Sequence, residues 1–117
     1  MKIKLSHIVG SVESLKALLD VKFPIKQSYR ISKLVNGPIE RELKSYNEAR
    51  NSLVAEFGDK NDDGSTQVKD PKKLEEFMIK MNELLDVDVE IEWEPINIED
   101  VESLNIEPRH LVSFIFA

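Results

Sequence analysis

Carboxylates are the most abundant reactive side chains in this 117-residue chain, and they gather in its second half. Twelve carboxylates and one basic residue, Lys80, lie between Glu75 and Glu107, whereas the residues before Glu75 include ten acidic and fourteen basic side chains. With Arg109, the whole chain has a net charge of −6. Such an acidic tract is either neutralised by the chain's own cations or offered to a basic partner.

Four of these carboxylates alternate with apolar residues over 87–94, a period of two that is typical of a strand with one apolar and one acidic face. The acidic face comprises Asp88, Glu90, Glu92 and Glu94. Residues two apart on a strand share a face, so these side chains repel one another unless cations offset them. Because 1–5 also alternates, we expect it to pair with 87–94 and to place Lys2 and Lys4 across from carboxylates.

A second hypothesis gives the acidic tract an external partner. Carboxylates spaced along an exposed strip imitate a phosphate backbone and attract a nucleic-acid-binding protein or another basic partner. The candidate partner-binding residues are then Asp88, Glu90, Glu92, Glu94, Glu99, Asp100 and Glu102. This hypothesis predicts an acidic, decoy-type inhibitor of a host defence or nucleic-acid-processing enzyme, whose binding weakens steeply with salt.

The polar segment 59–70 has part of the ligand spacing of an EF-hand calcium loop. Loop positions one, three, five, six and twelve hold Asp59, Asn61, Asp63, Gly64 and Asp70. The twelfth ligand of such a loop is a bidentate Glu, whereas Asp70 has a shorter side chain and precedes Pro71 as a helix cap. Turn chemistry at Asp63 and Gly64 explains the same residues without a metal, so both interpretations stay open.

Other reactive groups are few. Cysteine is absent, which excludes disulfides, thiolate metal sites and thiol nucleophiles. The two histidines, His7 and His110, lack a recognisable metal-ligand spacing, and the chain has neither a G-x-S-x-G motif nor a glycine-rich phosphate loop. We therefore expect no catalytic residues, no cofactor and, apart from the open question of calcium, no metal site; the protein is predicted not to be an enzyme.

The elements that must position these residues are mainly helices. Apolar residues at steps of three and four predict helices over about 7–19, 24–35, 38–57 and 71–86. The second and third are expected to be nearly collinear, with Asn36 as a fresh cap where Gly37-Pro38 interrupts the pattern. Short helices are also predicted over 97–104 and from Pro108 onward.

Five cationic side chains of the two collinear helices share a sector opposite the apolar stripe. This basic ridge comprises Lys26, Arg30, Lys33, Arg41 and Lys44. Three interpretations fit it: a solvated helix face, a dock for the chain's own acidic tract, or a phosphate-binding surface. The negative net charge and the scarcity of aromatic residues beside the ridge disfavour direct nucleic-acid binding.

The last residues are almost entirely apolar. Phe114, Ile115 and Phe116 must therefore be docked in the core or against a partner, and we include them among the candidate partner-binding residues. No run approaches the roughly 20 apolar residues of a membrane helix, and the first residues lack the apolar core of a signal peptide. A cytoplasmic protein without membrane contact is expected.

Together these patterns predict one α+β domain over residues 1–117. A long kinked helical hairpin made by 24–57 and 71–86 is expected to be covered on one side by a small antiparallel sheet. That sheet would contain 1–5 and 87–94, with 66–69 as a candidate third strand. Short C-terminal helices complete the predicted core.

The order of these parts resembles a family of small uncharacterised proteins from phages and prophages of Gram-positive bacteria. The segments with the resemblance are KQSYRISKLV, the EL-x-x-Y-N-E-A-R stretch that ends in EFG, the D-D-G turn, NELLDVDVEIEWEPI and IEPRHL. The resemblance implies no activity, cofactor or catalytic residue, only a setting in the host bacterial cytoplasm. We therefore expect a noncatalytic accessory protein that binds a protein partner, either itself or a host protein.

Overall fold

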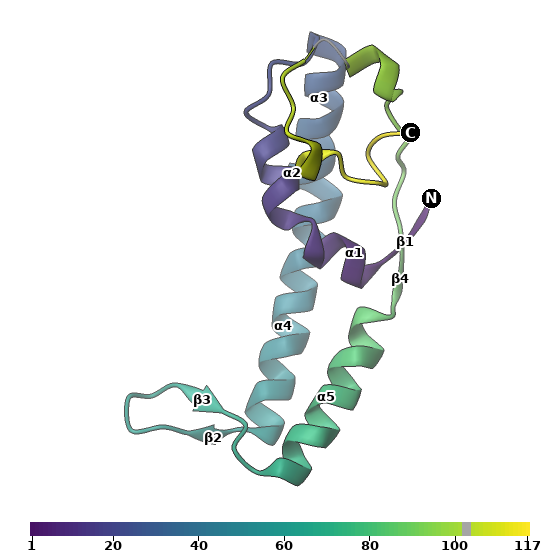
Figure 1. The fold of residues 1–117 in the computed structure, drawn as a ribbon. Coiled ribbons are helices and arrows are strands. Elements are labelled where there is room, and N and C mark those ends of the chain that lie inside the picture. The colour runs from purple at the N-terminus through teal and green to yellow at the C-terminus, as the bar shows by residue number, and fades with distance from the viewer. Residues whose placement is uncertain (102–103) are drawn as a thin grey trace.

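The computed structural model describes residues 1–101 and 104–117. Its axis is one long helix, in which α3 (Ile25–Leu34), the π-helical turn η1 (Val35–Ile39) and α4 (Glu40–Phe57) follow one another (Figure 1). α5 (Pro71–Leu85) runs back beside the distal part of α4. The predicted α+β fold with a long helical hairpin is confirmed.

The interruption at Gly37-Pro38 is absorbed by η1, and the expected fresh cap at Asn36 is wrong. The Asn36 amide donates to the Ser32 hydroxyl at 3.2 Å instead. Proline lacks an N–H, and a π-turn, with its i→i+5 hydrogen bonds, accommodates the lost bond without ending the helix. A π-turn also suits the spacing of Ile31, Val35, Ile39 and Leu43, because steps of four drift around a regular helix of 3.6 residues per turn.

The first predicted helix is divided in two. α1 (Leu5–Gly10) and α2 (Val12–Leu18) are separated by Ser11, whose N–H donates to the Ile8 carbonyl and closes the end of α1. Glycine and serine both favour helix ends over helix interiors, which explains the break within the predicted 7–19 helix. The two short helices lie across α3 and place Leu5, Ile8, Leu15 and Leu18 in the core.

The predicted pairing of the first strand with the acidic strand is confirmed. β1 (Lys2–Lys4) and β4 (Asp88–Glu90) are antiparallel, with Lys2 opposite Glu90 and Lys4 opposite Asp88. β4 is shorter than the predicted 87–94, because the chain beyond Ile91 turns to another partner. Ile96 forms an isolated parallel bridge with Phe116, and its N–H donates to the Ile115 carbonyl at 2.8 Å.

The candidate third strand is wrong. β3 (Thr66–Gln67) pairs with β2 (Asp59–Lys60) as a separate hairpin at the far end of the long helix (Figure 1). Gly64 has a φ of +87° at its turn, a conformation that glycine adopts without steric cost. The D-D-G signal therefore marks a local hairpin rather than an extra strand of the main sheet.

The C-terminal segment has less helix than predicted. η2 (Ile98–Val101) and η3 (Pro108–His110) are single 3-10 turns, and the residues after His110 are irregular. A nearly continuous apolar run has no 3.6-residue period, so nothing in it selects a helix over an irregular path through the core. Residues 102 and 103, which fall in the predicted 97–104 helix, lie outside the described residues.

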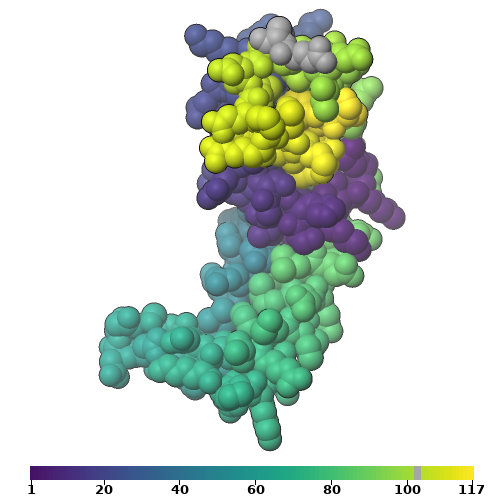
Figure 2. Space-filling view, viewed as in Figure 1, coloured from purple at the N-terminus to yellow at the C-terminus, as the bar shows by residue number. Residues whose placement is uncertain are grey.

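The core occupies only one end of the molecule. Among the described residues, all eighteen buried side chains lie before Glu40 or after Asp88. We call this end the head, and we call α4, α5 and the β2–β3 hairpin the arm. Figure 2 shows a broad head above a narrower arm, and the extents are 51 × 29 × 23 Å. Within the described residues, no helix is both long and apolar enough to span a bilayer.

Candidate interaction surfaces

The near end of the acidic tract is neutralised by the first strand. Lys4 Nζ lies 3.0 Å from Asp88 Oδ1 and 3.3 Å from Asp86 Oδ1, and the amino group of Met1 lies 3.0 Å from Glu90 Oε1. The hydrogen bond with Asp88, followed by that with Asp86, raises the pKa of Lys4 above its ordinary value. The expected offset of carboxylates by Lys4 is confirmed, while Glu90 uses the Met1 amino group rather than Lys2.

The far end of the tract is open. Glu92, Glu94, Glu99 and Asp100 are exposed, and within the described residues none of them forms an ion pair. Glu102, the remaining acidic candidate, lies outside the residues that the structure describes. The tract thus combines an internally paired part around β4 with an unpaired part around Glu92 to Asp100.

One residue of the basic ridge connects the long helix to the acidic segment. The Arg30 guanidinium lies over the Trp93 ring, 4.6 Å from its centroid, and Arg30 Nη2 donates to the Glu94 carbonyl oxygen. Trp93 Nε1 in turn donates to the Ile115 carbonyl at 3.3 Å. The ridge is therefore a dock for the acidic segment at Arg30, through an aromatic ring and the backbone rather than through carboxylates.

A groove separates the rest of the ridge from that segment. It has a volume of about 570 Å³, and Gly37 and Pro38 of the π-turn line it together with the exposed Lys33 and Arg41. A larger groove of about 760 Å³ lies between α2 and α4, where Leu15, Leu19, Ile39 and Leu43 contribute its apolar lining. The π-turn η1 contributes residues to both grooves.

The apolar C-terminal residues are docked in the core, which is the first of the two alternatives considered from the sequence. Phe114, Ile115 and Phe116 are 8%, 0% and 4% exposed. The Phe116 ring stacks on Phe23, with the ring centroids 6.4 Å apart. Since these side chains already contact the head, an interface for another molecule has to be sought elsewhere.

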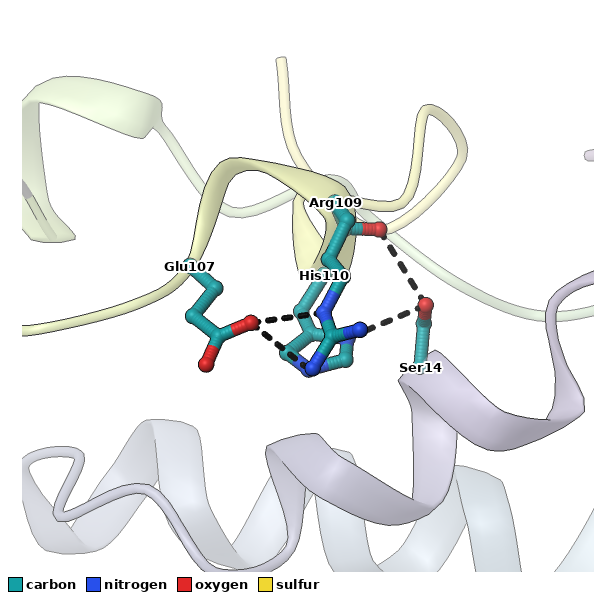
Figure 3. Close-up of polar contacts among 4 residues, drawn as sticks. All are labelled: Ser14, Glu107, Arg109 and His110. Atoms are coloured by element: carbon teal, nitrogen blue, oxygen red, sulfur yellow. Dashed lines mark hydrogen bonds and ion pairs between the residues drawn. The ribbon is translucent and has the colours of Figure 1, made fainter.

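A polar cluster joins the C-terminal segment to α2 (Figure 3). The Ser14 hydroxyl donates to the Arg109 carbonyl at 3.1 Å and lies 3.1 Å from His110 Nδ1. Because its single proton is used by Arg109, His110 Nδ1 must be the donor to the Ser14 oxygen. The sequence did not suggest this cluster, because Ser14 and His110 are ninety-six positions apart.

The cluster has the residue types of a Ser-His-acid triad but not the geometry. A triad requires the acid within hydrogen-bonding reach of the ring nitrogen that does not face the serine. His110 Nε2 lies 3.9 Å from Glu107 Oε2, and that carboxylate is engaged by Arg109 Nε at 2.6 Å. We therefore interpret the cluster as a structural tie between η3 and α2.

The residues of the candidate calcium loop are used by turn and cap hydrogen bonds. Asp63 Oδ1 accepts from the Ser65 N–H at 2.9 Å and from the Ser65 hydroxyl at 2.6 Å, which lowers the pKa of Asp63. Asp70 Oδ1 accepts from the Lys72 N–H at 2.9 Å and caps α5. Within the described residues, no group of three or more His, Asp or Glu converges as a metal site.

The arm exposes apolar side chains that the sequence analysis assigned to a core-facing stripe. Leu74, Met78 and Ile79 of α5 are 40%, 56% and 52% exposed. Phe77, Met81 and Leu84, on the side of α5 toward α4, are half-buried. The signal was present in the sequence, because apolar residues occupy more of the circumference of α5 than one neighbouring helix can cover. We call Met78, Ile79, Glu75 and Asn82 with their flanking residues the outer face of α5.

Comparisons of the chain with protein-family models, with curated protein sequences and with solved structures gave no match.

Proposed function

We propose that the protein is a noncatalytic binding protein that acts by protein–protein contact or self-assembly through the arm. The observation that supports this proposal is the outer face of α5, where Met78 and Ile79 are each more than half exposed on a helix pair without a buried residue among those described. Apolar side chains gathered on one helix face are characteristic of a docking surface.

The energetic argument concerns what the arm lacks. An isolated pair of helices gains stability chiefly from apolar burial, and full burial of one large side chain contributes about 1.5–3 kcal/mol. Met78 and Ile79 leave roughly half of that contribution unused in the single chain. A partner that covers the outer face would therefore stabilise both the complex and the arm itself.

The biological setting is proposed from the resemblance alone. Segments such as KQSYRISKLV and NELLDVDVEIEWEPI resemble phage and prophage proteins of Gram-positive bacteria. We place the protein as an accessory factor in the host bacterial cytoplasm, where its partner would be itself or a host protein. The proposed role needs no cofactor, membrane or nucleic acid.

The test compares captured and cross-linked proteins for matched baits in extract of a Gram-positive host. We expect the double variant Met78→Glu/Ile79→Lys to lose the specific cross-links of the wild-type chain, including any to itself, because charges would replace the apolar contact. The matched control is Ile25→Lys, which places a charge on a head residue that is 83% exposed. Identical cross-links from all three baits would contradict a role for the arm.

The open end of the acidic tract supports an alternative, the acidic decoy-type inhibitor. Glu92, Glu94, Glu99 and Asp100 are exposed and unpaired within the described residues, as a strip that attracts a basic partner requires. Under this alternative, Glu92→Lys/Glu94→Lys would abolish capture while Met78→Glu/Ile79→Lys would not. Binding that is insensitive to salt would exclude the decoy.

A further inference from the structure

We infer that the occupant of the outer face is a second copy of this chain, with two α5 helices packed antiparallel about a two-fold axis between Met78 and Ile79. This inference rests on the proposed function and names its partner. The argument uses the exposure of the residues on α5 and the order of their charges along the helix.

The outer face is free because α4 covers a different side of α5. At about 100° per residue, Met78 and Ile79 lie on either side of a line along the helix, and Glu75 and Asn82 lie on that line one turn away. All four side chains are exposed. The half-buried Phe77, Met81 and Leu84 lie more than a quarter turn to one side, toward α4.

A two-fold axis at the midpoint makes the centre of this face complementary to itself. It places Met78 on Ile79 of the second copy and Ile79 on Met78 of the second copy, which buries both apolar pairs together. One turn away on each side, Glu75 meets Asn82 of the second copy. An amide donor thus lies opposite each carboxylate, and the pair meets the hydrogen-bonding needs of both groups.

The edges of the face are complementary in the same register. In a two-fold antiparallel pair, like edges meet, so Lys72 lies between Glu83 and Asp86 of the second copy at both ends of the contact. On the edge beside α4, Leu74 meets Leu85 of the second copy. A parallel arrangement would instead place Lys72 against Lys72, and it would align the two helix dipoles unfavourably.

The size of the face sets the expected strength. A standard stable interface buries about 800 Å² on each partner, and one helix of fifteen residues offers a narrower strip. We therefore expect reversible pairing that rises with protein concentration and depends on the two charged ends. The full-length chain should be a monomer when dilute and a dimer when concentrated.

The test is a charge exchange followed by sedimentation analysis over a range of concentrations. Lys72→Glu alone, and Glu83→Lys/Asp86→Lys alone, should each weaken self-pairing by roughly tenfold, because both ends of each homodimer become repulsive. An equimolar mixture of the two variants should pair as well as the wild type, because opposite charges then meet at both ends. These residues are exposed, so the variants are expected to fold.

The matched control is Lys73→Glu, which makes the same charge change in the same helical turn but outside the outer face. It should pair like the wild type. A wild-type chain that stays monomeric at all concentrations, or a mixture that does not recover pairing, would overturn the inferred self-pairing. If cross-links to other proteins are still lost in Met78→Glu/Ile79→Lys, the proposed function would stand with a different occupant.

Discussion

Lys4 is the single residue that neutralises most of the acidic side chains near β4. Its ammonium contacts both Asp86 and Asp88, and these contacts raise its pKa above 10.5. The resulting stabilisation is fully present below pH 10.5 and is lost as the pH rises through the higher pKa of the folded state. The lysine thus offsets carboxylates across the whole neutral range.

We expect Lys4→Met to lower the melting temperature at neutral pH, because Asp86 and Asp88 would then repel each other without a cation between them. The difference from the wild type should disappear at strongly alkaline pH, where Lys4 is uncharged in both states. Thermal melting followed by circular dichroism across pH measures this. Lys2→Met, on the same strand, is the control, and an equal loss in that variant would argue against a specific role of Lys4.

Ile115 shows how the apolar C-terminal residues stabilise the head. Its side chain is 0% exposed, and its carbonyl accepts hydrogen bonds from both Ile96 and Trp93. We expect Ile115→Ala to reduce the free energy of unfolding by about 2–5 kcal/mol through a cavity in the core. Urea denaturation measures this loss. Leu111→Ala, at a position that is 36% exposed, should have a clearly smaller effect.

At the scale of elements, the end of α4 depends on a close approach at Gly58. A Cβ added there would meet the Val54 carbonyl and lie 2.6 Å from Thr66 Cγ2, so a side chain would push the β2–β3 hairpin away from α4. The glycine is needed for space rather than for a left-handed conformation, since Gly58 has a φ of −94°.

We expect Gly58→Ala to reduce the free energy of unfolding by about 1–3 kcal/mol, in the range typical of overpacking. Gly10→Ala is the control, because Gly10 has no heavy atom within 4 Å of an added Cβ. That control should leave stability unchanged or raise it by about 0.4–1 kcal/mol. Chemical denaturation distinguishes the two, and equal effects would contradict the crowding at Gly58.

Sequence periodicity was enough to predict the elements whose partners are close in the chain. The helix over 71–86 and the D-D-G hairpin have local signals in their caps and turn residues, and the alternation in 1–5 and 87–94 was enough to predict their pairing. The destination of 66–69 was wrong because β-propensity does not specify a partner strand. The π-turn was missed because a proline signals an interrupted pattern but does not distinguish a break from a wider turn.

The interaction surfaces were harder to predict for a similar reason. The sequence shows that α5 has apolar residues, but only the packing shows that α4 leaves Met78 and Ile79 uncovered. The fate of Phe114 to Phe116 likewise depended on contacts with distant residues such as Phe23. Contacts between residues far apart in the chain leave no periodic trace in a single sequence.

At the scale of the whole molecule, the head and the arm should differ in local stability. The described residues of the arm include no buried side chain, whereas α3 contributes Ile31 and Leu34 to the core. Local opening depends on how much apolar contact must be broken. The arm is therefore expected to open without unfolding of the head.

Hydrogen exchange measures this difference directly. In dilute protein, amides of α5 and of the distal half of α4 should exchange faster than those of α3 by at least about tenfold. If the second copy covers the outer face, exchange in α5 should slow as concentration rises, while α3 stays unchanged. Uniform protection of head and arm in dilute protein would contradict the division.

The π-turn η1 also determines how such a protein can diverge. Because η1 is wider than a regular helical turn, loss of one residue from Val35–Ile39 would restore the ordinary pitch and rotate everything that follows by about 100°. α5 would then point in a new direction while α1, α2 and α3 kept their positions. Small insertions and deletions at this one turn give evolution a way to redirect the arm without rewriting the residues that dock.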